Sequence, residues 1–186
     1  FFKKCIEMGR AFVVEDYQQK PMPLFLLWRG IVHVTLRNPH QKYIIGGVSI
    51  SNQFSDFSKS LMIEFMRSHY FDPIVAQYVH AKNEYKVKLK EEERSLIFED
   101  NADLNKFDKL IDELEPNMLR LPVLIKKYIK QNAKVIAFNV DPKFNDAIDG
   151  LMYIRISDLP ESTVKPVLED IQAELERKLK EEKSKE

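Results

Sequence analysis

Three residues near the start of the chain, Glu7, Gly9 and Arg10, bring together a carboxylate, a position without a side chain and a guanidinium. A carboxylate in this setting can act as a general base. On a regular strand, residues three apart face opposite sides, which would separate Glu7 from Arg10. A bulge at Gly9 would bring them together. A structural ion pair between the two charges is the plain alternative.

The sequence lacks the patterns of most other catalytic chemistries. It contains no HExxH, CxxC, GxxxxGK[ST], GxGxxG or GxSxG motif, and none of its four histidines is followed five residues later by aspartate. Zinc sites, the usual nucleotide cradles and nucleophile elbows are therefore disfavoured. No metal site is expected. The chemistry that survives is a direct group transfer that needs positioning, a base and a donor to a developing oxyanion.

A second polar group stands at the end of an apolar run, where Ser49, Ser51 and Asn52 follow KYIIGGV. These hydroxyl and amide groups could contact a substrate. Equally, Ser51 and Asn52 could end the strand and cap a turn. Further along, Asp141, Asn145 and Asp149 resemble a metal loop only superficially, and their spacing favours a turn with side-chain caps.

Strands and helices of ordinary length must position these residues. The sequence predicts strands at 5–14, 42–52, 84–90, 133–140 and 151–159 from their β-branched or alternating residues. Helices are expected from Pro23 to Asn38, from Ser55 or Asp56 to residue 71, at 103–114 and at 121–131. Such alternation indicates an α/β layered fold. The segment 141–150 is expected to be a turn.

Composition sets further limits on partners and location. Lys plus Arg equals Asp plus Glu, 29 each, which argues against a nucleic-acid binder that works by overall attraction. Lone Cys5 cannot form an internal disulfide, so a cytoplasmic location is expected. No apolar run approaches the ~18 residues that span a bilayer. The chain is expected to form one domain over residues 1–160, with an amphipathic helix and charged tail at 161–186.

Several motifs together resemble a known family. The run Glu7–Val13 (EMGRAFV), LFLLWRGI, YIIGGVSISN and the stretch from Leu121 to Gly150 are similar to the acyl-carrier-protein-dependent branch of GNAT-like proteins. That branch includes the N-acyltransferases of ornithine- and glycine-lipid synthesis and haemolysin-like proteins, and it is related to acyl-homoserine-lactone synthases. The resemblance runs from the first residues to about Asp158. It implies a GNAT-like mixed sheet flanked by helices, here without its N-terminal strands.

The resemblance also implies an activity and a site. It implies transfer of a long-chain, 3-hydroxy acyl group from acyl carrier protein to the amine of a small amino acid, with the acyl-phosphopantetheine thioester as co-substrate and no tightly bound cofactor. The thioester arm would lie between segments 5–14 and 43–51. Glu7 and Arg10 would be catalytic. The donor-binding residues would be Gly9, Ala11, Phe12, Val48, Ser49, Ser51 and Asn52.

One departure from the wider superfamily bears on the donor. Acetyl-CoA-dependent members carry a glycine-rich loop whose N–H groups bind pyrophosphate. The corresponding stretch here, YQQKPMPLF, has no glycine and contains two prolines. Acyl carrier protein has no pyrophosphate, so the loss fits that donor.

Two alternative functions stay open. The same cleft could acylate a hydroxyl group, or the domain could bind an acyl chain or a partner without turnover. Peripheral contact with the inner membrane face is expected only because the product would be lipophilic. Arg29, His33 and Arg37 share one face of the helix that starts at Pro23, where they could meet acidic acyl carrier protein or anionic lipid, although a solvated face is the plainer interpretation.

Overall fold

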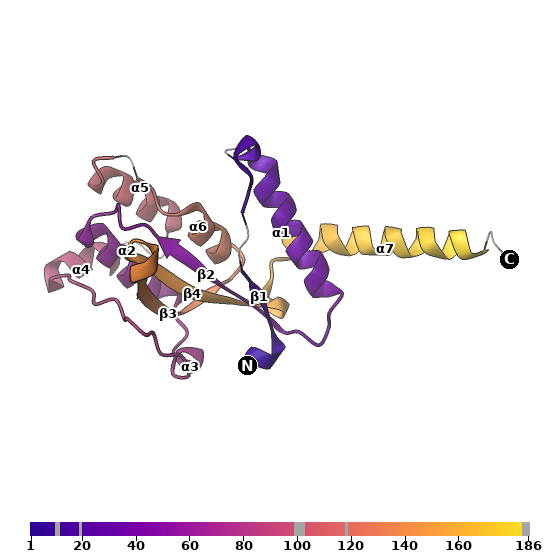
Figure 1. The fold of residues 1–186 in the computed structure, drawn as a ribbon, viewed down its shortest axis with the longest axis horizontal. Helices are drawn as coiled ribbons and strands as arrows, with labels where there is room; N and C mark the ends of the chain where they lie inside the picture. The colour runs from indigo at the N-terminus through magenta and orange to yellow at the C-terminus, as the bar shows by residue number, and fades with distance from the viewer. Residues whose placement is uncertain (10–11, 19, 99–102, 118, 184–186) are drawn as a thin grey trace. The chain divides into compact units, whose positions relative to one another are not determined.

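A computed structural model describes the chain except for residues 10–11, 19, 99–102, 118 and 184–186 (Figure 1). Its four strands are β1 (Cys5–Met8), β2 (Tyr43–Ile50), β3 (Lys134–Asp141) and β4 (Ala147–Arg155). They form one sheet in the order β1-β2-β4-β3, flanked by helices. This mixed α/β architecture is consistent with a GNAT-like fold, and the predicted fold class is confirmed.

The chain divides into two compact units, each described here by itself. Unit 1 comprises residues 1–44 and 155–186, and unit 2 comprises residues 45–154. Unit 1 contains β1, α1 (Pro21–Leu36) and α7 (Glu161–Lys183). Unit 2 contains most of β2 and β4, all of β3, and the helices α2 (Asp56–Tyr70), α3 (Pro73–Ala76), α4 (Glu91–Phe98), α5 (Leu104–Leu114) and α6 (Val123–Ile129).

The core of unit 2 surrounds α2. Residues 58–63 and 65–66 of this helix are all buried, so α2 is covered on nearly every side. The ring of Phe65 stacks on that of Phe107 in α5, with centroids 3.9 Å apart and planes 2° apart. A helix buried in this way derives its stability from packing more than from intrinsic propensity. Of the four apolar residues that recur at helical spacing in α5, Leu104, Phe107 and Ile111 are buried, whereas Leu114 is exposed.

Strands β3 and β4 of unit 2 form a hairpin. Strands β3 and β4 pair antiparallel, with Phe138 opposite Gly150 and Asp141 opposite Ala147. A Cβ on Gly150 would lie 3.3 Å from the Phe138 ring, so glycine lets the ring pack across the strand. The turn between the strands places Asn145 and Asp146 at φ 53°, a left-handed conformation that Asn and Asp tolerate better than most residues.

In unit 1, α1 and α7 pack against each other through charge pairs. The Arg29 Nε–H donates to Asp170 at 2.9 Å, and Arg37 pairs with Glu174. Arg29 and Arg37, two of the three basic residues on this face of α1, are therefore paired with carboxylates of α7. These pairs are partly exposed, and such pairs stabilise by ~1 kcal/mol or less each.

Capping residues set the starts of three helices; the sequence predicted the starts of α2 and α5 and did not predict α3. Ser55 Oγ accepts the Ser58 N–H at the start of α2, Asp72 accepts two N–H groups of α3, and Asp103 does the same for α5. Helix α1 begins at Pro21, with proline in its first turn as expected. Helix α4 was not predicted.

Three strand predictions were wrong in extent. Strand β1 ends at Met8 rather than residue 14, and a 3-10 turn at Glu15–Tyr17 follows. Strand β4 begins at Ala147, inside the segment expected to be a turn. In segment 84–90, only Glu84 forms a bridge, with Asn139, because the segment instead packs along α2.

The Phe65–Phe107 stack predicts where unit 2 is most sensitive to truncation. Phe107→Ala should lower the free energy of unfolding by about 3–5 kcal/mol, because Phe107 is 4% exposed and its removal leaves a cavity against α2. Phe144→Ala, at a position 64% exposed, should change it by less than ~0.5 kcal/mol. Urea denaturation followed by circular dichroism measures both. Equal losses would show that the stack is not part of the core.

Candidate functional site

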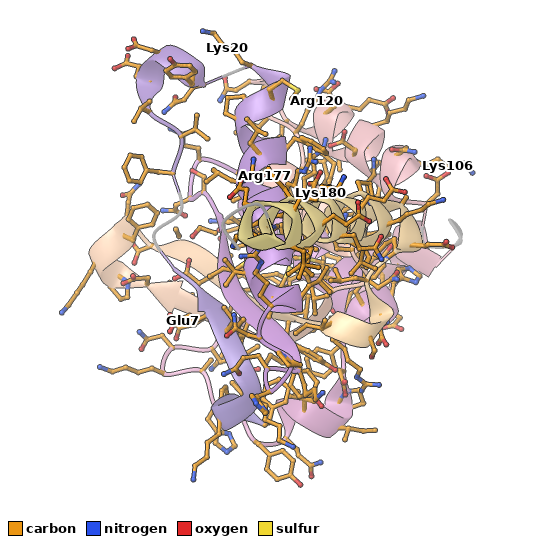
Figure 2. The ribbon with its side chains drawn as sticks, turned by 90° about the vertical axis from the view of Figure 1, so that its right-hand side faces the viewer. Glu7, Lys20, Lys106, Arg120, Arg177 and Lys180 are labelled. Carbon is orange, nitrogen blue, oxygen red and sulfur yellow. The ribbon has the colours of Figure 1, made fainter. Side chains whose placement is uncertain are left out.

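The residues predicted to do chemistry fall into two groups, one in each unit. Glu7 lies exposed on β1 (Figure 2), and a Cβ built on Gly9 would lie 3.6 Å from its Oε1, so the carboxylate lies over the backbone just past the strand. Phe12 is exposed. Arg10 and Ala11 lie outside the described residues, and the predicted relation between Glu7 and Arg10 stays a prediction. Because β1 ends before Gly9, the described strand contains no bulge there.

The second group stands at the end of β2, in unit 2. Burial alternates along this strand, so Ser49 and Ser51 are exposed while Val48 and Ile50 point into the core. Val48 is 2% exposed, so this predicted donor-binding residue is buried. Ser51 Oγ accepts the Gln53 N–H at 3.2 Å, the turn-capping role that was one of the two interpretations.

Ser49 reaches across to the neighbouring strand β4, where its hydroxyl donates to Asp149 Oδ1 at 2.6 Å. The two residues are 100 positions apart in the chain. Asp149 faces the more open side of β4 and is half-buried. Sequence reasoning treated Asp149 as a turn cap, which was wrong, because the residue belongs to a strand. Asp141 does cap the turn, accepting the Lys143 N–H at 2.9 Å.

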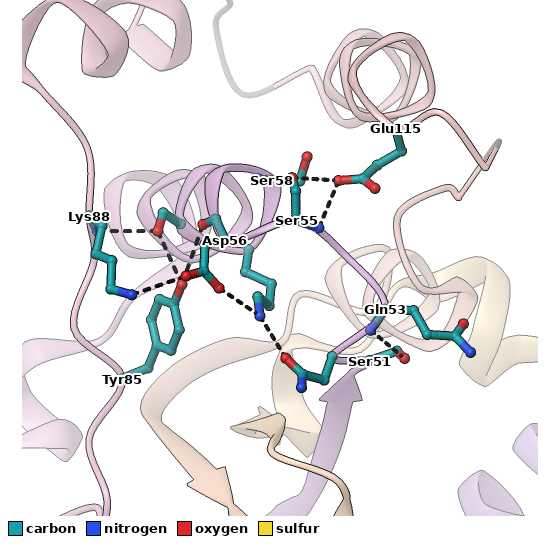
Figure 3. A network of polar contacts seen from close by, with 11 residues as sticks. Ser51, Gln53, Ser55, Asp56, Ser58, Tyr85, Lys88 and Glu115 are labelled. Atoms are coloured by element: carbon teal, nitrogen blue, oxygen red, sulfur yellow. Dashed lines mark hydrogen bonds and ion pairs between the residues drawn. The ribbon is translucent and has the colours of Figure 1, made fainter.

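Asn52 is held by a buried lysine that sequence reasoning missed. Lys59 is 6% exposed, and its Nζ donates to Asn52 Oδ1 at 2.7 Å and pairs with Asp56 at 2.9 Å (Figure 3). An ammonium group has only donors, so it fixes the Asn52 amide with its oxygen inward. The NH₂ group of Asn52 is then the part of the amide left to serve a ligand. The signal in the sequence was a lysine in the first turns of α2, three residues after an aspartate and just before the apolar residues 61–63.

A network of polar contacts extends from this lysine over the start of α2 (Figure 3). Asp56 also pairs with Lys88 at 3.0 Å. Buried Glu115, which follows α5, accepts the Ser55 N–H at 3.1 Å and the Ser55 hydroxyl at 2.8 Å. Burial alone would raise the pKa of Glu115, but donors at the start of α2 and nearby Lys59 lower it below its ordinary value. The two buried charges therefore lie at one helix terminus, each with polar partners.

An open hollow of 520 Å³ lies beside these groups in unit 2. Its lining comes from the end of β2 and from the β3–β4 turn: Ser49, Ser51, Asn52, Lys143, Phe144, Asn145 and Ala147. The lining offers the Lys143 ammonium, the side-chain amides of Asn52 and Asn145, and the hydroxyls of Ser49 and Ser51. The Asp149 carboxylate lies next to the hollow, where it accepts the Ser49 hydroxyl. Among the described residues, no group of three or more His, Cys, Asp or Glu side chains could hold a metal ion.

Comparison with known proteins gives one distant relationship. No family model matches the chain, and no solved structure matches it. A curated protein of Bacteroides thetaiotaomicron named glycine N(alpha)-acyltransferase is 21% identical over 169 residues, which is 87% of this chain and 50% of that protein. The chain thus spans about half the length of this relative. The similarity supports acyl transfer as the general class of function. Within the described part of the chain, no helix is long and apolar enough to cross a membrane.

The Asp56 contacts predict a pH-dependent contribution to stability. Hydrogen bonds from Lys59 and then Lys88 lower the pKa of Asp56 from 3.8 to about 2. A depressed pKa in the folded state stabilises the protein above the ordinary pKa, and the benefit is lost as pH falls from about 4 to about 2. Asp56→Asn should therefore destabilise the protein at pH 6, by less than ~1 kcal/mol because Asp56 is largely exposed. At pH 2 the difference should be much smaller than at pH 6, because Asp56 is then largely protonated in the unfolded state and half protonated in the folded state.

Urea unfolding of both proteins between pH 2 and pH 6 measures this difference. Repeating it in a Lys88→Met background should shrink the Asp56→Asn effect without removing it, because Lys59 still pairs with Asp56. A difference of constant size across the whole range would contradict the assignment of the low pKa to these lysines.

Proposed function

We propose that the protein is an N-acyltransferase that moves a long-chain acyl group, of the 3-hydroxyacyl kind, from acyl carrier protein to the amine of a small amino acid. The observation that carries the proposal is the similarity, along 87% of the chain, to a protein named for N-acylation of glycine. The confirmed α/β architecture agrees with it. The product would be an aminolipid.

The reaction needs little from the protein beyond position and proton transfer. The amine nitrogen attacks the thioester carbonyl, the C–N bond forms, the C–S bond breaks, and the phosphopantetheine thiol leaves. A small amino acid is mostly protonated at neutral pH, so a base must remove a proton before attack. We assign that role to exposed Glu7. The Gly9 backbone N–H is assigned to the thioester oxygen, where negative charge develops.

The start of α1 favours acyl carrier protein over coenzyme A as donor. A helix N-terminus binds pyrophosphate through its free N–H groups. Helix α1 begins Pro21-Met22-Pro23, so two of its first three residues have no N–H to offer. A donor without pyrophosphate loses nothing by this. The acyl-phosphopantetheine thioester is accordingly the co-substrate in our proposal, with no resident cofactor.

Glu7→Gln tests the proposed base. With acyl carrier protein thioesters and glycine, the variant should form N-acyl product ~10²- to 10⁴-fold more slowly, because the amide cannot take the proton. Glu15→Gln, at another exposed carboxylate of unit 1, should leave the rate unchanged. Product is measured by mass spectrometry, and the same acyl group on coenzyme A should react at least ~10-fold less efficiently. Full activity of Glu7→Gln would assign the base elsewhere.

A patch on α1 supports a second candidate function, the binding of an acyl chain or a membrane surface. Met22, Phe25 and Leu26 are all more than half exposed, and Lys20 precedes the helix (Figure 2). Adjacent large apolar side chains on one surface are typical of an interaction site. In the enzymatic proposal, the patch brings a cytoplasmic protein to the inner membrane face, where a lipophilic product can leave. In a protein without turnover, such binding would be the whole function.

Vesicle sedimentation tests the patch. Wild-type protein should co-sediment with vesicles of neutral and anionic phospholipid, and Phe25→Ser/Leu26→Ser should reduce the bound fraction by ~10-fold or more, since each side chain adds buried apolar area. Val34→Ser, at an equally exposed position near the other end of α1, is the matched control and should bind as wild type does. Equal binding by all three proteins would exclude the patch as the contact surface.

A further inference from the structure

The hollow of unit 2 combines two groups that suit an ammonium or amine. Ser49 donates its only hydroxyl proton to Asp149, so its oxygen lone pairs remain to accept. Asp149 does not itself line the hollow, but its carboxylate lies directly behind the Ser49 hydroxyl that it accepts. Both residues stand on strands of the same sheet, β2 and β4, which makes their spacing rigid. A ligand N–H group placed at the hollow would meet the Ser49 oxygen, with the negative charge of Asp149 next to it.

The same hollow presents two groups that suit a carboxylate. Lys59 holds Asn52 Oδ1, which leaves the Asn52 NH₂ group as a donor at the hollow. Lys143 is exposed on the β3–β4 turn, and its backbone is fixed by the cap from Asp141. A neutral amide donor and an ammonium group together match the two oxygens of a carboxylate.

The surrounding charges separate this ligand class from others. Between residues 141 and 149 the chain carries three aspartates and one lysine. A phosphate group would be repelled by Asp149 and its neighbours, so a purely anionic ligand fits poorly. A simple amine would leave Lys143 and Asn52 without a partner. A small molecule with both charges satisfies all four groups.

We propose that this hollow is the acceptor site and binds a small zwitterionic amino acid, with the nitrogen at Ser49 and Asp149 and the carboxylate at Asn52 and Lys143. The inference rests on the acyl-transfer function proposed above. It gives to the acceptor two residues, Ser49 and Asn52, that the sequence assigned to the donor. Lys59 becomes a positioning residue that acts through Asn52. Buried Ala147 and exposed Phe144 supply the apolar part of the hollow's lining.

Binding can be measured without any acyl transfer. In ¹⁵N-labelled protein, glycine at millimolar concentration should shift the amide signals of residues 49–52 and 143–149, and acetate or methylammonium alone should shift them less. Lys143→Met and Asp149→Asn should each weaken glycine binding by about 10-fold, the lower end for a charge-assisted hydrogen bond. Lys134→Met is the matched control, because Lys134 is exposed at the opposite end of β3, ~23 Å away by strand length.

Acyl transfer then tests the assignment of the carboxylate end. Glycinamide keeps the amine of glycine and lacks its carboxylate. Lys143→Met should lower kcat/KM for glycine by about 10-fold and for glycinamide by less than ~2-fold, whereas Asp149→Asn should lower both. Lys59→Met should raise KM for glycine with little change in kcat, because a released Asn52 amide can turn its oxygen to the ligand. Since Lys143 is exposed, its variant should fold normally.

The outcomes separate this inference from the proposed function. Glycine-dependent shifts at these amides with no N-acyl product from any donor would keep the acceptor site and reject the acyltransferase. Turnover with an unchanged glycine-to-glycinamide ratio in Lys143→Met would keep the acyltransferase and reject this site. Shifts with phosphate that exceed those with glycine would also reject it, in favour of an anion site.

Discussion

The buried ammonium of Lys59 is the constraint on which the candidate site depends. A charge removed from water is costly unless it is paired and hydrogen-bonded. Lys59 meets that requirement with Asp56, one helical turn earlier, and with Asn52, at the end of β2. The pairing joins the end of a strand to the start of the central helix. The two partners differ in what their loss would do: loss of Lys59 leaves an exposed carboxylate that still pairs with Lys88, whereas loss of Asp56 removes the counter-charge of a buried ammonium.

Glu115 supports the same terminus from the other side. Its carboxylate accepts two hydrogen bonds from Ser55, so the residue that caps α2 is itself held by the end of α5. Stacking of Phe65 on Phe107 ties the same two helices together by apolar contact. Polar and apolar contacts thus fix one geometry, and the loop 51–55 has little freedom left. A site edge built on such a loop is preorganised, which lowers the entropic cost of ligand binding.

Local patterns predicted much of this fold, and long-range pairs account for what they missed. The sequence predicted the helix starts at Ser55 and Asp103 because each capping interaction joins residues only a few positions apart. The alternation in 84–90 indicated a strand. In the structure the Lys88 ammonium pairs with Asp56 and the Lys88 backbone N–H donates to Ser60 Oγ, so the segment follows α2 instead. The sequence did not predict the Ser49–Asp149 hydrogen bond, because the two residues are 100 positions apart and only the order of the strands in the sheet brings them together. The polar end of β2 was found, but its partners were not.

The two ends of the proposed acceptor site stand on elements of different rigidity, and this difference bears on which acceptors the site can take. The nitrogen side stands on two neighbouring strands, β2 and β4, whose spacing is set by backbone hydrogen bonds. The carboxylate side depends on Lys143, on a short turn in which Asn145 and Asp146 adopt left-handed conformations. In the proposed reaction every acceptor has an amine, whereas the rest of the acceptor molecule can vary. A rigid strand pair for the constant group and a turn for the variable one would let substitutions at 142–146 change the preferred acceptor without disturbing the position of the attacking nitrogen.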